Sequence, residues 1–139
     1  MVSGAYVDHG IIADAEDGHQ WLDLTGSGVS TGTMGVTQTV STVAGMTYSL
    51  TFWVGNAFKP GGDLGTISTV GLKIHGTCAG SFTNSAQGAA LNWQQFSTTF
   101  TAAGNSSIIE FDNLDPSTDS SNGLDNVVLQ TLGSAAPFQ

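Results

Sequence analysis

The sequence predicts an all-β protein folded as an antiparallel β-sandwich, and three observations lead to this fold class. Apolar and polar residues alternate at period two in several short segments, which is typical of strands with one buried face. Clusters of Gly, Ser, Asn and Asp separate these segments, as turns do between the strands of a sandwich. No stretch of ten or more residues shows helical periodicity.

The clearest strand is predicted over Thr47–Val54, directly after a turn at Ala44-Gly45. One face of this strand holds four large apolar side chains: Tyr48, Leu50, Phe52 and Val54. The other face is polar except for Trp53, and alternation of this kind places one face in the core and the other outside it. Trp53 is therefore predicted either on a recognition surface or in a second packed layer, and the sequence leaves both readings open.

The same alternation predicts six further strands: Gln20–Leu24, Val36–Val40, Val70–His75, Phe96–Ala102, Ser107–Phe111 and Leu124–Gln130. Phe96 and Phe100 are expected to point into the core from the fourth of these. Turn-rich segments are predicted between the strands: Thr25–Gly35, Ala57–Gly65, Cys78–Ala90 and Asp112–Gly123.

A chain of 139 residues is long enough to bury a core without disulfides or metal. We predict one sandwich domain over residues 1–132 and a C-terminal tail or linker over 133–139. Cys78 is the only cysteine, so no internal disulfide can form, and we predict a small buried or half-buried thiol.

The charge balance excludes several classes of partner. Lys59 and Lys73 are the only lysines, arginine is absent, and the formal net charge is −9. Nucleic acids and anionic membranes are poor partners, because binding them requires basic side chains. No segment is apolar enough to insert into a membrane, and no signal-peptide pattern follows Met1. Neutral glycans, calcium and other proteins remain as partners.

Five short motifs in chain order resemble a family of galactose-binding-like extracellular domains. The matching segments are Trp21–Gly26, Gly35–Val40, Val43–Asn56, Trp93–Ala102 and Leu124–Val127. They are similar to the family patterns W-x-D-L-x-G, G-x-x-Q-T, G-x-x-Y-x-L-x-F followed by G-N, W-x-x-x-S-x-x-F-T-A, and L-D-N-V. The family includes bacterial choice-of-anchor domains and plant cell-wall proteins of unknown function.

This resemblance implies a jelly-roll sandwich that is secreted and associates with cell-surface or wall polysaccharide. The family also has an earlier strand with the pattern N-G-x-F-E, which has no counterpart after Val2 in this sequence. Two alternatives stay open: the fold tolerates the loss, or a neighbouring molecule supplies the strand by self-association, because an open sheet edge can pair with another chain. In related sandwiches that strand helps to hold a structural calcium ion.

Four residues are predicted to bind a ligand: Trp53, Trp21, Lys73 and His75. An indole ring offers a flat apolar surface on which the C–H face of a sugar can stack. Trp21 shares a strand face with Asp23. As for Trp53, the sequence leaves open whether Trp21 lies on a recognition surface or in a second packed layer. Trp93 matches a packing position of the family, so we assign it to the core.

Lys73 and His75 fall on one face of the strand Val70–His75, from which they could reach the hydroxyls of a ligand. The alternative is an ordinary solvated strand face, which we favour.

Asp125 and Asp112 are the predicted metal ligands, with calcium as the ion. Calcium takes six to eight oxygen ligands, and an acidic cluster near the C-terminus supplies carboxylates: Glu110, Asp112, Asp115, Asp119 and Asp125. Asp125 also matches a family position near the calcium site. The alternative is that Asp125 and Asn126 hydrogen-bond to the backbone at the start of the strand.

The sequence has no nucleophile elbow, zinc motif or other catalytic arrangement, so we predict that the protein is not an enzyme. The weakest hypothesis is a glycoside-active enzyme that uses Glu110 and Asp125. The leading hypothesis is a secreted, non-catalytic module that binds carbohydrate or mediates adhesion at the cell surface. The alternative is an extracellular structural subunit that assembles by edge-strand pairing or strand exchange.

Overall fold

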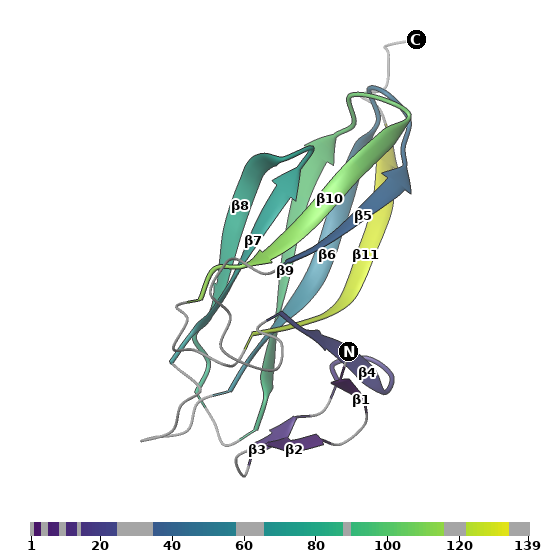
Figure 1. Ribbon diagram of the computed structural model, residues 1–139. Helices are drawn as coiled ribbons and strands as arrows, with labels where there is room; N and C mark the ends of the chain where they lie inside the picture. The colour runs from purple at the N-terminus through teal and green to yellow at the C-terminus, as the bar shows by residue number, and fades with distance from the viewer. Residues whose placement is uncertain are drawn as a thin grey trace.

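The computed structural model describes the backbone of residues 2–3, 6–8 and 11–13 and the full residues 15–24, 35–57, 66–87, 90–115 and 122–133. All regular structure in these ranges is β-strand, so the all-β prediction is confirmed (Figure 1). Within the same ranges, no helix has the length and apolar character required to cross a bilayer.

Two antiparallel sheets lie face to face. The five-stranded sheet has the order β1 (Val2–Ser3), β4 (Gln20–Asp23), β11 (Gly123–Gly133), β6 (Thr47–Asn56) and β9 (Asn92–Thr101). The four-stranded sheet has the order β5 (Gly35–Ser41), β10 (Ser106–Asn113), β7 (Ser68–Ile74) and β8 (Thr77–Asn84). A separate hairpin pairs β2 (Tyr6–Asp8) with β3 (Ile11–Ala13).

The strand pairings identify the topology as a jelly roll. β7 pairs with β8, β6 with β9, β5 with β10 and β4 with β11, so the chain forms a set of nested antiparallel pairs. Successive strands from β4 to β7 alternate between the two sheets, and the long hairpin is thereby rolled into a sandwich. The predicted jelly-roll sandwich is confirmed.

The core lies between the sheets and consists of the alternate residues that the sequence pattern places inward. Its buried members are Leu24, Leu50, Phe52, Val54, Val70, Leu72, Ile109, Phe111 and Leu124. Phe96 and Phe100 pack against this cluster as expected. Phe52 is at its centre, with its ring edge-on to those of Phe82 and Phe111.

The prediction of a turn-rich segment over Cys78–Ala90 is wrong for its first half, because β8 occupies Thr77–Asn84. β8 is an edge strand, so most of its residues are exposed, and Phe82 is the residue of β8 that packs onto the core cluster. Cys78 lies opposite Lys73 on the solvent side and is exposed, which contradicts the predicted buried or half-buried thiol.

The prediction that His75 belongs to a strand is also wrong. β7 ends at Ile74, and His75 and Gly76 form the two-residue turn that joins β7 to β8. Both residues have positive φ, 51° and 75°, as a type I′ hairpin turn requires. His75 therefore leaves the strand face that Lys73 occupies.

Candidate functional site

Three tryptophans share the outer face of the five-stranded sheet, at the end near β4. Trp53 alternates with the buried residues of β6, and Gly55 is on the same face two positions further along. Trp93 of β9 pairs with Gly55, and Trp21 of β4 is on the same side as Asp23, which pairs with Gly123. We call this surface, which carries Trp21, Trp53 and Trp93, the tryptophan face.

Two glycines allow the indole rings to lie directly on the sheet. A Cβ atom on Gly55 would be 2.9 Å from Cζ3 of Trp93, and one on Gly123 would be 2.9 Å from Cη2 of the same ring. The ring of Trp21 also approaches Gly123 and meets that of Trp93 edge-on, with centroids 5.8 Å apart. The assignment of Trp93 to the core between the sheets is therefore wrong, because its ring packs outside the sandwich.

Burial separates the roles of the tryptophans. Trp21 is 7% exposed, so it belongs to a packed layer outside the core, which is one of the two alternatives left open by the sequence. Trp53 is half-buried and remains partly accessible on the outer face. Of the two predicted tryptophan ligands, Trp53 is the better placed to meet a ligand.

Polar side chains flank Trp53 on both neighbouring strands. Its direct cross-strand partners are Gln95 of β9 and Asp125 of β11. Hydroxyl and amide side chains continue the same face along the sheet: Ser49, Thr51, Ser97, Thr99 and Gln130. The arrangement combines an apolar ring with amide, hydroxyl and carboxylate groups, and the described residues of this face include no lysine or arginine. It can stack on an apolar face and hydrogen-bond to surrounding hydroxyls.

Asp125 organises the loop that precedes β4. Its Oδ2 accepts hydrogen bonds from the backbone N–H groups of Glu16 and Asp17, at 2.9 and 3.1 Å. Its Oδ1 accepts one from the N–H of Asn126 at 2.8 Å, and Asn126 Nδ2 donates to Oε2 of Glu16. A carboxylate has about four acceptor positions, so Asp125 retains capacity for a ligand. The contacts of Asp125 match the backbone-bonding alternative, whereas the side chain of Asn126 bonds to a carboxylate instead of the backbone.

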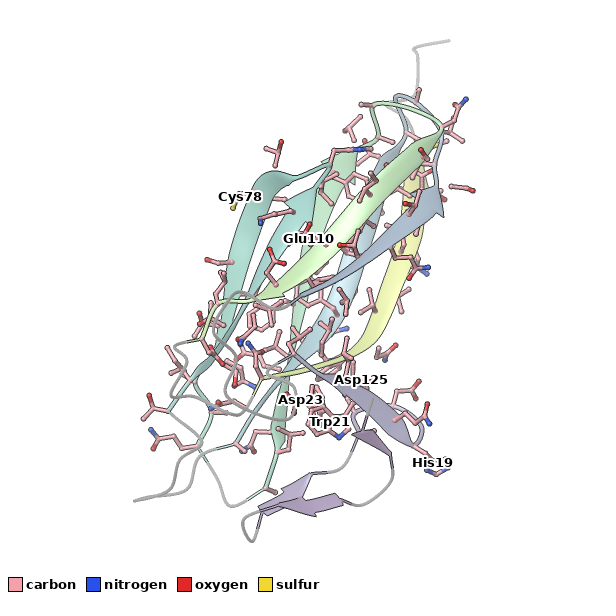
Figure 2. All side chains as sticks on the ribbon, in the orientation of Figure 1. His19, Trp21, Asp23, Cys78, Glu110 and Asp125 are labelled. Atoms are coloured by element: carbon pink, nitrogen blue, oxygen red, sulfur yellow. The ribbon has the colours of Figure 1, made fainter. Side chains whose placement is uncertain are left out.

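The structure does not bring Asp112 and Asp125 together. Asp112 lies on β10 of the four-stranded sheet, whereas Asp125 lies on β11 of the five-stranded sheet. Within the described ranges, no three His, Cys, Asp or Glu residues are grouped as a metal site. The calcium ion therefore stays a prediction. Glu110 and Asp125 are likewise on different sheets (Figure 2), so they do not form a pair for glycoside hydrolysis.

Lys73 belongs to an ion cluster on the outer face of the four-stranded sheet, away from the tryptophan face. Its Nζ is 3.0 Å from Oδ2 of the buried Asp112 and 3.6 Å from Oε1 of Glu110. The hydrogen bond to Asp112, with the negative charges of Asp112 and Glu110, raises the pKa of Lys73 above its ordinary value. This ion cluster accounts for Lys73 without a ligand.

We expect the replacement Lys73→Met to destabilise the protein only while Lys73 is charged. Because the pKa of Lys73 is raised on folding, its contribution is complete below the unfolded pKa of about 10.5 and is lost as pH rises through the folded pKa. Urea unfolding of both proteins from about pH 8 upwards measures this difference. The control Lys73→Arg keeps its positive charge over this pH range. If wild type and Lys73→Met differ in the free energy of unfolding by the same amount even in strong alkali, the ion-pair role is contradicted.

The described residues form a jelly-roll β-sandwich with aromatic and polar side chains on the outer face of its five-stranded sheet. Among solved structures, the C-terminal domain of EclA, described as a sugar-binding protein, is similar to this chain. The match has a TM-score of 0.55 and 14% sequence identity, and it covers 73% of this chain and 79% of that one. Similarity at this level shows a shared fold. No protein-family model and no curated protein sequence matches the chain.

Proposed function

We propose that the protein is a secreted, non-catalytic module that binds a neutral polysaccharide on the tryptophan face. The observation that carries this proposal is the half-buried Trp53, placed between Gln95 and Asp125 on an open sheet face. A pyranose ring stacked on the indole would present its hydroxyls to the amide and the carboxylate. The sugar-binding description of a protein with the same fold supports the same class of ligand.

Charge favours a neutral glycan over an acidic one. The net charge is −9, and Lys73, the one lysine in the described ranges, is held by Asp112 and Glu110 on the other sheet. An anionic polysaccharide would therefore meet no lysine or arginine among the described residues of the tryptophan face.

Affinity electrophoresis against neutral and acidic polysaccharides tests the proposal. We expect retardation by a neutral glycan and at least about tenfold weaker binding after Trp53→Ala, because a buried aromatic contact of this kind often dominates an interface. Gly55→Ala should also weaken binding, since its Cβ would displace the ring of Trp93.

Two controls accompany the electrophoresis: a variant outside the tryptophan face and a comparison of gels with and without calcium. His75→Ala changes a turn on the other sheet and should leave retardation unchanged. Parallel gels with calcium and with chelator test the predicted ion at Asp125. The absence of retardation by every polysaccharide, or equal retardation of wild type and Trp53→Ala, would overturn the proposal.

A further inference from the structure

A side cavity of about 610 Å³ opens between the two sheets, on the side where β5 faces β11. Most of its wall consists of inward-facing apolar side chains of both sheets: Leu22, Val36, Val40, Leu50, Ile109, Phe111, Leu124, Val127 and Leu129. Trp21 completes the wall, and the polar groups of the lining come from Gln20, Thr37, Gln38, Asp125 and Asn126. The volume is within the range of cavities that bind ligands, about 300–1,000 Å³.

Apolar side chains on both walls remain exposed to solvent. Val36 on β5 is 37% exposed and Val127 on β11 is 45% exposed, although both line the side cavity. They form the two opposing sides of one opening, so the apolar surface is continuous from the cavity to the exterior.

The strands beside the side cavity also have open edges. β5 is the last strand of its sheet and pairs with β10 alone. β4 pairs with β11 only at Gly123 and Leu124, so the described strands leave residues 127–133 of β11 paired on one edge only, with β6. Backbone N–H and C=O groups on such edges are available to another strand.

We propose that the side cavity is an acceptor site for one extended strand of another polypeptide, which adds to β11 at residues 127–133. A strand meets both requirements of the site, because its backbone pairs with the edge while alternate side chains enter the cavity. A small apolar molecule would fill the cavity and leave the edge unpaired. The net charge of −9 favours a strand that is neutral or basic and carries small apolar residues at alternate positions.

The acceptor site and the proposed sugar site share two residues, because Trp21 and Asp125 line the side cavity as well as belonging to the tryptophan face. Trp53 is outside the cavity lining and projects from the outer face of the five-stranded sheet, whereas Val36 lines the cavity from the other sheet. Substitutions at Val36 and at Trp53 therefore test the two activities separately.

A synthetic peptide serves as the probe, with valine at every second position, threonine between the valines and a lysine at each end. The matched control peptide has the same composition with its valines adjacent, so its apolar residues cannot all face one way. We expect saturable binding of the labelled alternating peptide by fluorescence anisotropy, and slower amide hydrogen exchange in residues 127–133 of the protein.

Three variants locate the binding. Val36→Lys and Val127→Lys place a charge at the opening and should each weaken peptide binding about tenfold. Val43→Lys makes the same change at a valine that is 56% exposed and outside the cavity lining, and it should bind as wild type does. Thermal melting of each variant alone confirms that it remains folded. Trp53→Ala should bind the peptide normally.

Other outcomes overturn the proposal. They are no saturable binding of the alternating peptide, equal binding of the control peptide, or equal weakening by all three lysine variants. In a fourth outcome, the protein binds the apolar dye anilinonaphthalene sulfonate but not the peptide, and Val36→Lys abolishes the binding of the dye. That result would identify a cavity for small apolar molecules instead of a strand acceptor.

Discussion

Replacement of Phe52 by alanine is expected to lower the free energy of unfolding by about 3–5 kcal/mol. Phe52 is fully buried. The centroid of its ring is 4.9 Å from that of Phe82, 5.0 Å from that of Phe111 and 6.1 Å from that of Phe96. These partners belong to β8, β10 and β9, so one side chain connects both sheets. Its removal loses the transfer free energy of a phenyl group and leaves a cavity that three rings on separate strands cannot easily fill.

The adjacent residue provides the control for Phe52→Ala. Trp53 is on the same strand but on the opposite, half-exposed face, so Trp53→Ala should cost about 1 kcal/mol and should mainly affect ligand binding. Urea unfolding followed by circular dichroism measures both losses, with the slope checked for constancy. Similar losses for the two variants would contradict the assignment of one side chain to the core and the other to the surface.

Replacement of Asn84 by alanine is expected to lower the free energy of unfolding by about 2–4 kcal/mol. Asn84 is fully buried at the end of β8, where its Nδ2 donates to the carbonyl oxygens of Val54 at 2.8 Å and Asn92 at 3.0 Å. Its Oδ1 accepts the N–H of Ala86 at 2.9 Å. Alanine would leave these backbone groups without the side chain that now pairs with them, and unpaired buried groups are more costly than the average hydrogen bond.

Asn92→Ala is the matched control for Asn84→Ala. The side chain of Asn92 donates a short-range bond to the carbonyl oxygen of Ala90 at an exposed position. Its loss should cost less than about 1 kcal/mol. Equal unfolding midpoints for Asn84→Ala and wild type would show that water or a local shift replaces the lost bonds.

Period-two alternation was sufficient to predict the inward faces of most strands. Leu50, Phe52 and Val54 are buried as predicted, and Phe96 lies directly opposite Phe52. The same rule, continued backwards from Phe96, places Gln95 and Trp93 on the outer face. The alternation therefore indicates the outer-face position of Trp93, whereas the resemblance to a packing position of a known family wrongly implies the core.

Other features could not be read from alternation. The bulge between Asp125 and Val128, where Asn126 has a positive φ of 46°, depends on how β11 fits β6. Gly55 and Gly123 are far apart in the sequence but pair directly in the sheet. Only this pairing shows that both glycines make room for the ring of Trp93. The side cavity depends on the short pairing of β4 with β11, which no local pattern records.

The nested strand pairs favour a folding order in which each pairing closes a short loop, so that the entropy cost of loop closure stays small. The turn at His75 and Gly76 closes the innermost pair with the shortest loop, and each pair further out joins segments more distant in the sequence. Loop-closure entropy rises with that separation, so the pairing of β4 with β11 is the most demanding when formed alone. Assembly outward from the central turn shortens every subsequent closure. The tryptophan face, which needs Trp21 of β4 beside Trp93 of β9, would then be completed last and would exist only in the fully assembled molecule.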